Sequence, residues 1–446
     1  MPFGSMKMGE KLVIKGGKSL QGVIKLRGAK NFVTKAMVAA ILGDSPSILY
    51  NVPHIKDVET VSQLLELHGC NVEYKKTEGI LQINPANILS PKIADMDILV
   101  GSSRIPILFC GPLLHKLGEA FIPNLGGCKI GDRPIDYHLE SLRLFGAVIE
   151  KAKNGVKIIA PNGLKGTKIN LPYPSVGATE QVLLTACISD GVTQLSNAAV
   201  EPEIIDLINV LQKMGAIISV STDRVITVEG VKNLRGFKHA SLPDRAEAAS
   251  WANAALSTGG KVFVDGANQQ DMTTFLNVFR KIGGEFDITD SGICFYHPGG
   301  ELNSIPIETN VHPGFLTDWM QPLVVCLTQA NGLSIIHETV YENRFGFTDA
   351  LNKMGAQIQI YRECLGSVPC RFRQMNYKHS AAIFGSTHLK GADIEVPDLR
   401  AGFSYLIAAL AAEGKSQVSG IEIIERGYES FFDKLLALGA DIELIK

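Results

Sequence analysis

The segment NLGGCKIGDRPID, residues 124–136, contains a cysteine whose neighbours could make its thiol chemically active. Cys128 follows two glycines, which disfavour a helix, and is followed by Lys129 and Arg133. Nearby cations lower the pKa of a thiol, so Cys128 could act as an acid. The alternative is that Cys128 is a small buried hydrophobic residue. The glycines and charges around it argue against burial, and we predict that this thiol is displayed for chemistry.

Charged residues also stand where buried helices are expected to begin. They are Lys30, Arg104, Arg245, Asp318 and Arg400, and each precedes or opens an apolar stretch. A cation at a helix N-terminus opposes the helix dipole by roughly 0.3–1 kcal/mol, whereas the free N–H groups at that end bind anions. The combination becomes favourable once a phosphate or carboxylate is bound. If the N-terminal ends of these helices in one domain face those in the other, we expect an anion site in the cleft between the domains. Arg426 could contribute to this site.

A simpler interpretation of these charges is ordinary ion pairing. The segments PDR (243–245) and PDLR (397–400) each place an aspartate close to an arginine. Structural ion pairs of this kind are common. For the whole set of charged helix starts we favour the anion site.

Six copies of one structural unit are predicted to position these residues. An amphipathic helix that ends in glycine and is followed by a short strand recurs along the chain. The glycines are Gly69, Gly146, Gly215, Gly283, Gly355 and Gly439. Glycine is favoured there because the residue after a helix often adopts the left-handed conformation. The segment 361–386, YRECLGSVPCRFRQMNYKHSAAIFGS, stretches the last interval, and the sequence predicts no function for it.

Each unit also contains a helix that is apolar on most faces. Examples are KNFVTKAMVAAILG (30–43) and RAGFSYLIAALAAEG (400–414). Such helices are buried, so we expect three units per domain, with these inner helices at the centre and the sheets outside. This predicts two similar α/β domains. One comprises residues 30–242, and the other comprises residues 1–29 together with 243–446.

The composition excludes several classes of protein. The 446 residues are 46% hydrophobic and carry a net charge of -2, without a basic block that could bind nucleic acid. No apolar run approaches the roughly 18 residues of a membrane span, and no signal peptide is evident. The eight cysteines form no C-x-x-C pair, and no Cys/His cluster has the spacing of zinc ligands. We therefore expect reduced thiols, a cytoplasmic location, and no metal or cofactor.

Several stretches together identify a family. They include LRGAKN (26–31), GGCKIGDRPIDYHL (126–139), PSVGATE (174–180), HPGFLTDWMQPL (312–323), ENRF (342–345) and ERGYE (425–429). In this order, over nearly the whole chain, they resemble the UDP-N-acetylglucosamine enolpyruvyl transferases. The resemblance implies two inverted α/β barrels, as in shikimate-pathway enolpyruvyl transferase. It also implies transfer of the enolpyruvyl group of phosphoenolpyruvate to the 3′-hydroxyl of UDP-N-acetylglucosamine, releasing phosphate. This is the first committed step of peptidoglycan synthesis, and it needs no metal.

The resemblance also implies roles for individual residues. Lys30, Arg133 and Arg400 match cations that bind phosphoenolpyruvate, and Cys128 matches a loop cysteine that fosfomycin alkylates. The remaining candidate substrate-binding residues are Asn31, Arg104, Pro134, Ile135, Asp136, His138, Ser175, Val176, Gly177, Val340 and Arg426. We assign Cys128 to proton delivery at C3 of phosphoenolpyruvate and Asp318 to proton removal from the sugar hydroxyl.

Some alternatives stay open at this point. Cys128 could act chiefly in product release, Asp318 could be a helix N-cap, and His138 could be structural. A shikimate-type acceptor is less favoured, because that family has DKS where this chain has GAKN. A non-catalytic sugar-nucleotide-binding protein is less favoured because Lys30, Cys128, Asp318 and Arg400 are all present. The two substrates are the expected partners, without nucleic acid or membrane, and the sequence leaves the oligomeric state open.

Overall fold

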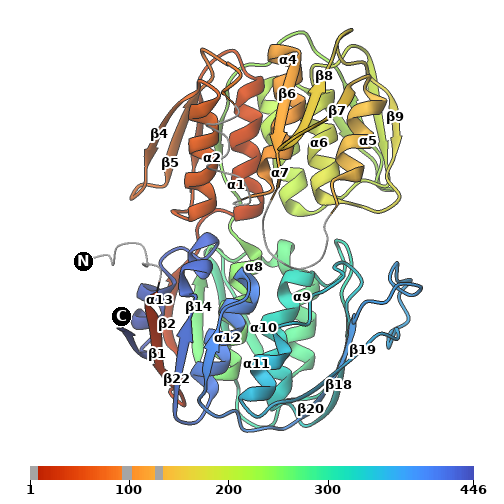
Figure 1. Cartoon of the computed structure of the whole chain (residues 1–446). Coiled ribbons are helices and arrows are strands. Elements are labelled where there is room, and N and C mark those ends of the chain that lie inside the picture. The colour runs from red at the N-terminus through yellow and green to blue at the C-terminus, as the bar shows by residue number, and fades with distance from the viewer. Residues whose placement is uncertain (1–8, 93–102, 126–133, 446) are drawn as a thin grey trace. The chain divides into compact units, whose positions relative to one another are not determined.

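The computed structural model describes residues 9–92, 103–125 and 134–445. Their contacts divide the chain into two compact units (Figure 1). The central unit consists of the described residues from Arg27 to Leu242. The terminal unit consists of those up to Leu26 and those from Pro243 onward. Each unit is built from three repeats of the same helix and strand pattern.

The central unit contains three sheets, and the order of the strands differs from their order along the chain. The first sheet is β13 (Lys238–Ala240), β3 (Ser47–Tyr50), β5 (Ile80–Asn84) and β4 (Asn71–Lys75). The second is β6 (Glu119–Pro123), β8 (Gly155–Ile159) and β7 (Val148–Ala152). The third is β11 (Ile217–Val220), β12 (Ile226–Glu229), β10 (Val192–Ser196) and β9 (Lys168–Asn170). Its inner helices are α1 (Lys30–Ala39), α4 (Cys110–Leu117) and α6 (Val176–Ala186), and its outer helices are α2 (Lys56–Leu67), α5 (Asp136–Leu144) and α7 (Pro202–Met214). Short 3-10 turns, η1 (Ala40–Leu42) and η3 (Ile105–Phe109), adjoin α1 and α4.

The terminal unit repeats this plan. Its first sheet is β21 (Asp393–Glu395), β22 (Lys415–Ser419), β1 (Lys11–Lys15) and β23 (Asp441–Ile445). The second is β15 (Glu285–Ile288), β16 (Gly292–Tyr296), β14 (Lys261–Asp265) and β2 (Gln21–Lys25). The third is β17 (Pro306–Glu308), β18 (Gly332–His337), β20 (Ser380–Gly385) and β19 (Gln357–Tyr361). Its inner helices are α8 (Arg245–Ser257), α10 (Thr317–Gln329) and α12 (Leu399–Ala411), and its outer helices are α9 (Gln269–Lys281), α11 (Thr348–Lys353) and α13 (Phe431–Ala437). The 3-10 turn η4 (Ile421–Arg426) precedes α13.

The first strands of the chain complete sheets that are otherwise formed by much later residues. β1 pairs antiparallel with both β22 and β23, with Leu12 opposite Val418 and Leu444. β2 pairs parallel with β14, with Val23 opposite Phe263. This pairing places the N-terminal strands in the terminal unit, and the chain passes from one unit to the other near residues 26 and 242.

The inner helices are buried as their apolar sequences predict. Every residue of α8 is buried, and so are the residues of α12 from Leu399 to Leu410. The outer helix α9 buries one face only, through Met272, Phe275, Leu276 and Phe279. Each unit therefore has its own apolar core around its inner helices. Although these helices are apolar, none in the described ranges is both long and apolar enough to cross a membrane.

The glycines that end the outer helices have the predicted backbone conformation. All six adopt positive φ angles, from 83° at Gly439 to 110° at Gly215. Residues with a Cβ atom rarely occupy this left-handed region because Cβ collides with the backbone. The repeat identified in the sequence is therefore confirmed at the level of local geometry.

Candidate active site

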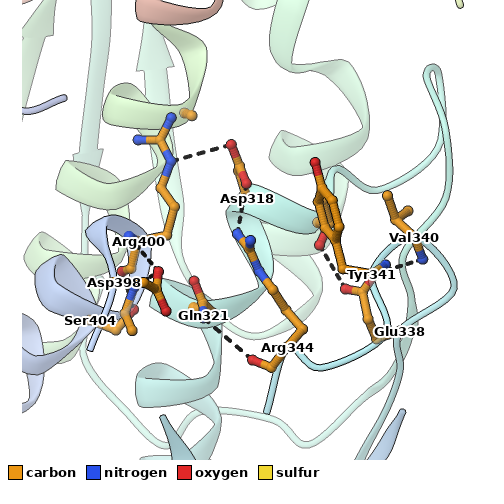
Figure 2. A network of polar contacts seen from close by, with 12 residues as sticks. Asp318, Gln321, Glu338, Val340, Tyr341, Arg344, Asp398, Arg400 and Ser404 are labelled. Atoms are coloured by element: carbon orange, nitrogen blue, oxygen red, sulfur yellow. Dashed lines mark hydrogen bonds and ion pairs between the residues drawn. The ribbon is translucent and has the colours of Figure 1, made fainter. Parts of the chain in front are cut away.

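In the terminal unit, one carboxylate is shared by two buried arginines (Figure 2). Asp318 lies in the first turn of α10, where its Oδ1 is 2.7 Å from an Nη of Arg344 and its Oδ2 is 3.3 Å from Nε of Arg400. The side chains of Arg344 and Arg400 are only 2% and 5% exposed. Nη1 of Arg400 is buried and has no hydrogen-bond partner among the described residues. Further carboxylates act on both cations, Asp398 on Arg344 and Asp244 on Arg400. The Arg400 nitrogen without a partner in the described part of the chain is the group that suits an anionic substrate.

The aspartates of the segments PDR (243–245) and PDLR (397–400) cap helices. Asp398 accepts hydrogen bonds from the N–H groups of Arg400 and Ala401, and Asp244 does the same for Ala246 and Glu247. An N-cap aspartate satisfies N–H groups that lack partners within the helix. The guanidinium of Arg400 instead reaches Asp318 on another helix.

The N-cap alternative for Asp318 is wrong. The N-cap residue of α10 is Leu316, which provides no side-chain cap, and Asp318 is the second residue of the helix. Each of the two carboxylate oxygens instead contacts an arginine.

The first turns of the inner helices α8, α10 and α12 meet in this unit. Trp319 of α10 donates its indole N–H to the carbonyl of Arg245, at 3.2 Å, and the Arg245 guanidinium lies 5.4 Å from the centre of the Trp319 ring. The Arg400 guanidinium lies 5.2 Å from the ring of the buried Tyr428, two residues beyond Arg426 at the end of η4. The predicted set Arg245, Asp318 and Arg400 is thus assembled at one end of the helix bundle.

Glu338 fixes the turn that follows β18 against the start of α10. Its Oε1 accepts hydrogen bonds from the N–H groups of Val340 and Tyr341, and its Oε2 accepts one from the hydroxyl of Thr317 at 2.7 Å (Figure 2). Burial raises the pKa of Glu338, against the opposing effect of Arg344 and these donors. Val340, a predicted substrate-binding residue, is therefore held close to the helix turn that carries Asp318.

In the central unit, Lys30 is paired with an acid. It is the first residue of α1, and its Nζ lies 2.8 Å from Oδ2 of Asp57 in the first turn of α2. Asn31 follows Lys30 and is partly buried. The ion-pair interpretation therefore holds for Lys30 in the structure without ligand, and an incoming anion would compete with Asp57.

The two segments predicted to bind the nucleotide meet at His138. A Cβ atom on Gly177 would lie only 3.0 Å from Nε2 of His138, so the ring packs directly on the start of α6. Ser175 caps this helix by accepting a hydrogen bond from the N–H of Ala178. Burial and the nearby charge of Arg104 lower the pKa of His138 to about 4, so the imidazole is neutral at pH 7.

Other predicted residues border this meeting point. Arg104 donates to the carbonyl of Pro134 at 3.4 Å. Ile135 is the N-cap residue of α5, Asp136 is its exposed first residue, and Val176 is the first residue of α6. Cys128 and Arg133 lie outside the described residues.

Three important residues were not singled out from the sequence. They are Arg344, Glu338 and Asp57, which contact Asp318, Thr317 and Lys30 respectively. Arg344 belongs to the stretch ENRF that supported the family resemblance. Its charge, within a stretch shared with the family, could have marked Arg344 as a candidate. The sequence does not show that its partner is Asp318.

Comparisons with known proteins agree with this geometry. The EPSP synthase (3-phosphoshikimate 1-carboxyvinyltransferase) family matches residues 14–435. The UDP-N-acetylglucosamine 1-carboxyvinyltransferase of Protochlamydia amoebophila is 48% identical over 98% of this chain and 94% of its own length. The corresponding protein of Chlamydia trachomatis serovar D is 43% identical, covering 96% of each chain. UDP-N-acetylglucosamine 1-carboxyvinyltransferase 1 of Staphylococcus aureus N315 is 38% identical over 98% of this chain and 99% of its own.

Solved structures share the fold. The enolpyruvyl transferase NikO from Streptomyces tendae superposes with a TM-score of 0.85 at 21% identity, covering 98% of both chains. EPSP synthase from Acinetobacter baumannii gives a TM-score of 0.74 at 17% identity, over 98% of this chain and 100% of that one. At these identities the likeness concerns the architecture, and it confirms the predicted fold of repeated α/β units.

Proposed function

The chain belongs to the UDP-N-acetylglucosamine 1-carboxyvinyltransferase family, and from this premise we propose which of its residues carry the reaction. It is a transferase that moves the enolpyruvyl group of phosphoenolpyruvate to UDP-N-acetylglucosamine in the first step of peptidoglycan synthesis. The activity predicted from the sequence is thereby confirmed. The observation that supports the residue assignment is the Asp318 carboxylate held between Arg344 and Arg400.

Phosphoenolpyruvate is bound by cations in this proposal. It carries a carboxylate and a phosphate on one small enol, and arginine forms paired hydrogen bonds with both groups. We assign Arg400 to this role because it is buried and one of its guanidinium nitrogens lacks a hydrogen-bond partner among the described residues. Lys30 and Arg133 join it, and Arg426 contributes further positive charge.

Asp318 accepts the proton from the 3′-hydroxyl of the sugar. Arg344 makes the shorter contact with the carboxylate, at 2.7 Å, and so keeps it in place. Arg400 makes the longer contact, at 3.3 Å through Nε alone. In the proposed complex, Arg400 turns from Oδ2 of Asp318 to the substrate anion, and Oδ2 accepts the hydroxyl proton. General base catalysis requires a carboxylate oxygen within hydrogen-bond reach of that proton.

Cys128 delivers a proton to C3 in the addition step. In the elimination step that follows, C3 loses a proton and phosphate leaves from C2, which restores the double bond. This assignment rests on the family resemblance and on the cations near Cys128 in the sequence. The nucleotide is bound by Asn31, Arg104 and the two segments that meet at His138, which are residues 134–138 and 175–177. We further propose that the two units are the two predicted domains, and the cytoplasmic location stays a prediction.

The direct test follows phosphate release from phosphoenolpyruvate. We expect release only when UDP-N-acetylglucosamine is also present, together with a product whose mass equals that of the sugar nucleotide plus an enolpyruvyl group. Shikimate 3-phosphate should not replace the sugar nucleotide as acceptor. Absence of release from a folded chain, or release with shikimate 3-phosphate instead, would refute the proposal.

A further inference from the structure

Two cysteines and two histidines come together in the segment for which the sequence suggested no function. Cys364, Cys370 and His379 lie between β19 and β20, and His337 is the last residue of β18. One ligand atom from each residue lies within 4.8 Å of the others. β18 and β20 are paired with His337 opposite Ser380, which brings His337 next to His379, with ring centres 5.5 Å apart.

Both histidines are oriented with one nitrogen toward this cluster. Nδ1 of His337 lies 2.9 Å from Oε2 of Glu308, and Nδ1 of His379 lies 2.9 Å from the carbonyl oxygen of Tyr377. Because both partners are acceptors, Nδ1 carries the hydrogen in each ring and Nε2 keeps its lone pair. Nε2 of His337 is completely buried and has no hydrogen-bond partner among the described residues. Nε2 of His379 lies 3.3 Å from Sγ of Cys364.

The loop between the two cysteines is built around Glu308. The Glu308 carboxylate accepts hydrogen bonds from the N–H groups of Ser367 and Val368, at 2.9 and 2.8 Å, in addition to the one from His337. A Cβ atom on Gly366 would lie 2.2 Å from Oε2 of Glu308 and 2.5 Å from Nδ1 of His337, so only glycine fits there. Histidines that bind metals usually donate their second N–H to a carboxylate or a carbonyl, which orients the ring.

We propose that His337, Cys364, Cys370 and His379 bind a structural zinc ion. Zinc–sulfur and zinc–nitrogen bonds of about 2.3 and 2.0–2.1 Å place tetrahedral ligand atoms roughly 3.3–3.8 Å apart. The 3.3 Å between Cys364 and His379 fits this geometry, and the other atoms need only a small contraction. Two thiolates and two imidazoles in a tetrahedron select zinc.

The charges of the site balance. Each thiol releases its proton to solvent on binding, so two thiolates neutralise the two positive charges of zinc while both histidines stay neutral. A two-iron cluster with the same ligand types would hold the cysteines and the histidines on different metal atoms. Direct approach of the Cys364 sulfur to the His379 nitrogen argues against such a cluster. Four protein ligands close the coordination sphere, so the ion is structural and not catalytic.

The zinc would anchor the loop to the turn beside the proposed active site. Arg371 follows Cys370, donates a hydrogen bond to the carbonyl of Val340, and pairs with Glu342 at 3.4 Å. Val340 lies in the turn that Glu338 holds against Thr317. The ion would thereby hold Arg371 against this turn. The zinc site itself does not depend on the catalytic roles proposed above.

The test measures the metal content of the full-length chain. The protein is produced without a polyhistidine tag, purified with reductant and analysed by mass spectrometry for metals. We expect one zinc per chain, and replacement by cobalt should produce the absorption bands of tetrahedral cobalt–thiolate coordination. The double variant Cys364→Ser, Cys370→Ser should lose both signals. The control Cys294→Ser, a partly buried cysteine elsewhere in the terminal unit, should keep both.

Several results would overturn the proposal. They are a metal-free chain that gives no cobalt–thiolate band on reconstitution, unchanged zinc in the double variant, and a Cys364–Cys370 disulfide in the reductant-purified protein. A second variant covers the case in which the double variant does not fold. Glu308→Gln should fold and weaken zinc binding by about 10–100-fold, because the carboxylate orients His337. Unchanged zinc affinity in Glu308→Gln would contradict the role of Glu308 in the site.

Discussion

At the scale of single residues, the active site depends on long-range charge pairing. Asp318 is reached by Arg344 from the segment after β18 and by Arg400 from α12. The three side chains are largely buried, so losing the negative charge that both guanidiniums contact would weaken their compensation in an environment that screens charges poorly. The carboxylate therefore has two functions in our proposal, to position the arginines and to accept a proton.

The first prediction concerns the charge of Asp318. Asp318→Asn keeps the shape of the side chain but removes the base, so kcat for phosphate release should fall by about 10²–10⁴-fold. Steady-state kinetics measures this, with circular dichroism to verify the fold. Asp287→Asn, at an exposed position of β15, is the matched control and should leave kcat unchanged. Near-normal kcat in Asp318→Asn would exclude Asp318 as the base.

The second prediction concerns which thiol reacts with an epoxide. Thiolates are the reactive species, and burial raises the pKa values of Cys70, Cys187 and Cys326 to about 12, so these thiols should be inert. From the family resemblance we expect fosfomycin to add once per chain, at Cys128, and Cys128→Ser to abolish the adduct. Peptide mass spectrometry locates the modification. An adduct at another cysteine in Cys128→Ser would contradict the assignment of this thiol.

The third prediction is a pH dependence of stability that arises from His138. Its pKa is about 4 in the folded chain, against an ordinary value of 6.5 in the unfolded chain, so its contribution is complete above pH 6.5. As the pH falls from about 6.5 to 4, the unfolded chain binds a proton that the folded chain does not, and roughly 2 kcal/mol is lost by pH 5. Urea unfolding at pH 7 and pH 5 measures the loss.

His138→Gln serves as the comparison for this pH effect. The stability difference between wild type and His138→Gln should shrink by about 2 kcal/mol from pH 7 to pH 5. Glu180 acts in the opposite direction over this range, because burial raises its pKa to about 7, but it is present in both proteins and cancels. A stability difference that does not change with pH would show that His138 titrates normally in the folded chain.

At the scale of elements, each repeat uses short-range rules at the two ends of its helices. Aspartates cap α8 and α12 at their N-termini, and glycines with positive φ end the outer helices. Both devices satisfy backbone groups that the helix itself leaves unpaired. Because these rules operate within a few residues, they can be recognised in a sequence without knowledge of the tertiary structure.

The fourth prediction tests one of these helix ends. Gly215 has a φ of 110° and no atom within 4 Å of an added Cβ, so Gly215→Ala is penalised by backbone strain alone. We expect a loss of about 1–2 kcal/mol, seen as a lower urea midpoint. Gly346→Ala is the matched control, because Gly346 has equal space and no positive φ. Equal stability of the two variants would mean that strain at Gly215 is absent or relieved.

At the scale of the whole molecule, the chain builds two units with separate cores from one repeated pattern. The N-terminal strands β1 and β2 belong to sheets of the terminal unit, so that unit cannot be completed from its later residues alone.

The fifth prediction concerns binding of the sugar nucleotide. Saturating UDP-N-acetylglucosamine should raise the thermal stability of the chain, because a ligand that binds only the folded state stabilises that state. Calorimetry of the full chain measures this, and about 2.7 kcal/mol is expected at a ligand concentration 100 times Kd. UDP alone is the control for contacts made by the nucleotide moiety. An unchanged melting temperature at saturating UDP-N-acetylglucosamine would contradict the proposed binding of this substrate.

The repeats, the buried inner helices, the conformation of the six glycines and the family with its activity could all be predicted from the amino-acid sequence. These features depend on periodicity, on local backbone conformation, or on stretches that are recognised in order, and each can be read from adjacent residues. The sequence also indicated that Lys30, Asp318 and Arg400 stand at the starts of helices, because the apolar stretch after each residue is visible in it.

The pairing of side chains that are remote in the sequence became visible in the folded chain. Arg400 has an aspartate two positions before it, yet that residue caps the helix, and the guanidinium pairs with Asp318, 82 positions away. The spacing of Cys364, Cys370 and His379 argued against a zinc site, and only the pairing of β18 with β20 brings His337 to them. The physical reason is that charge pairing and metal coordination depend on distances of a few ångströms in space, which the packing of remote elements sets and which local sequence does not encode.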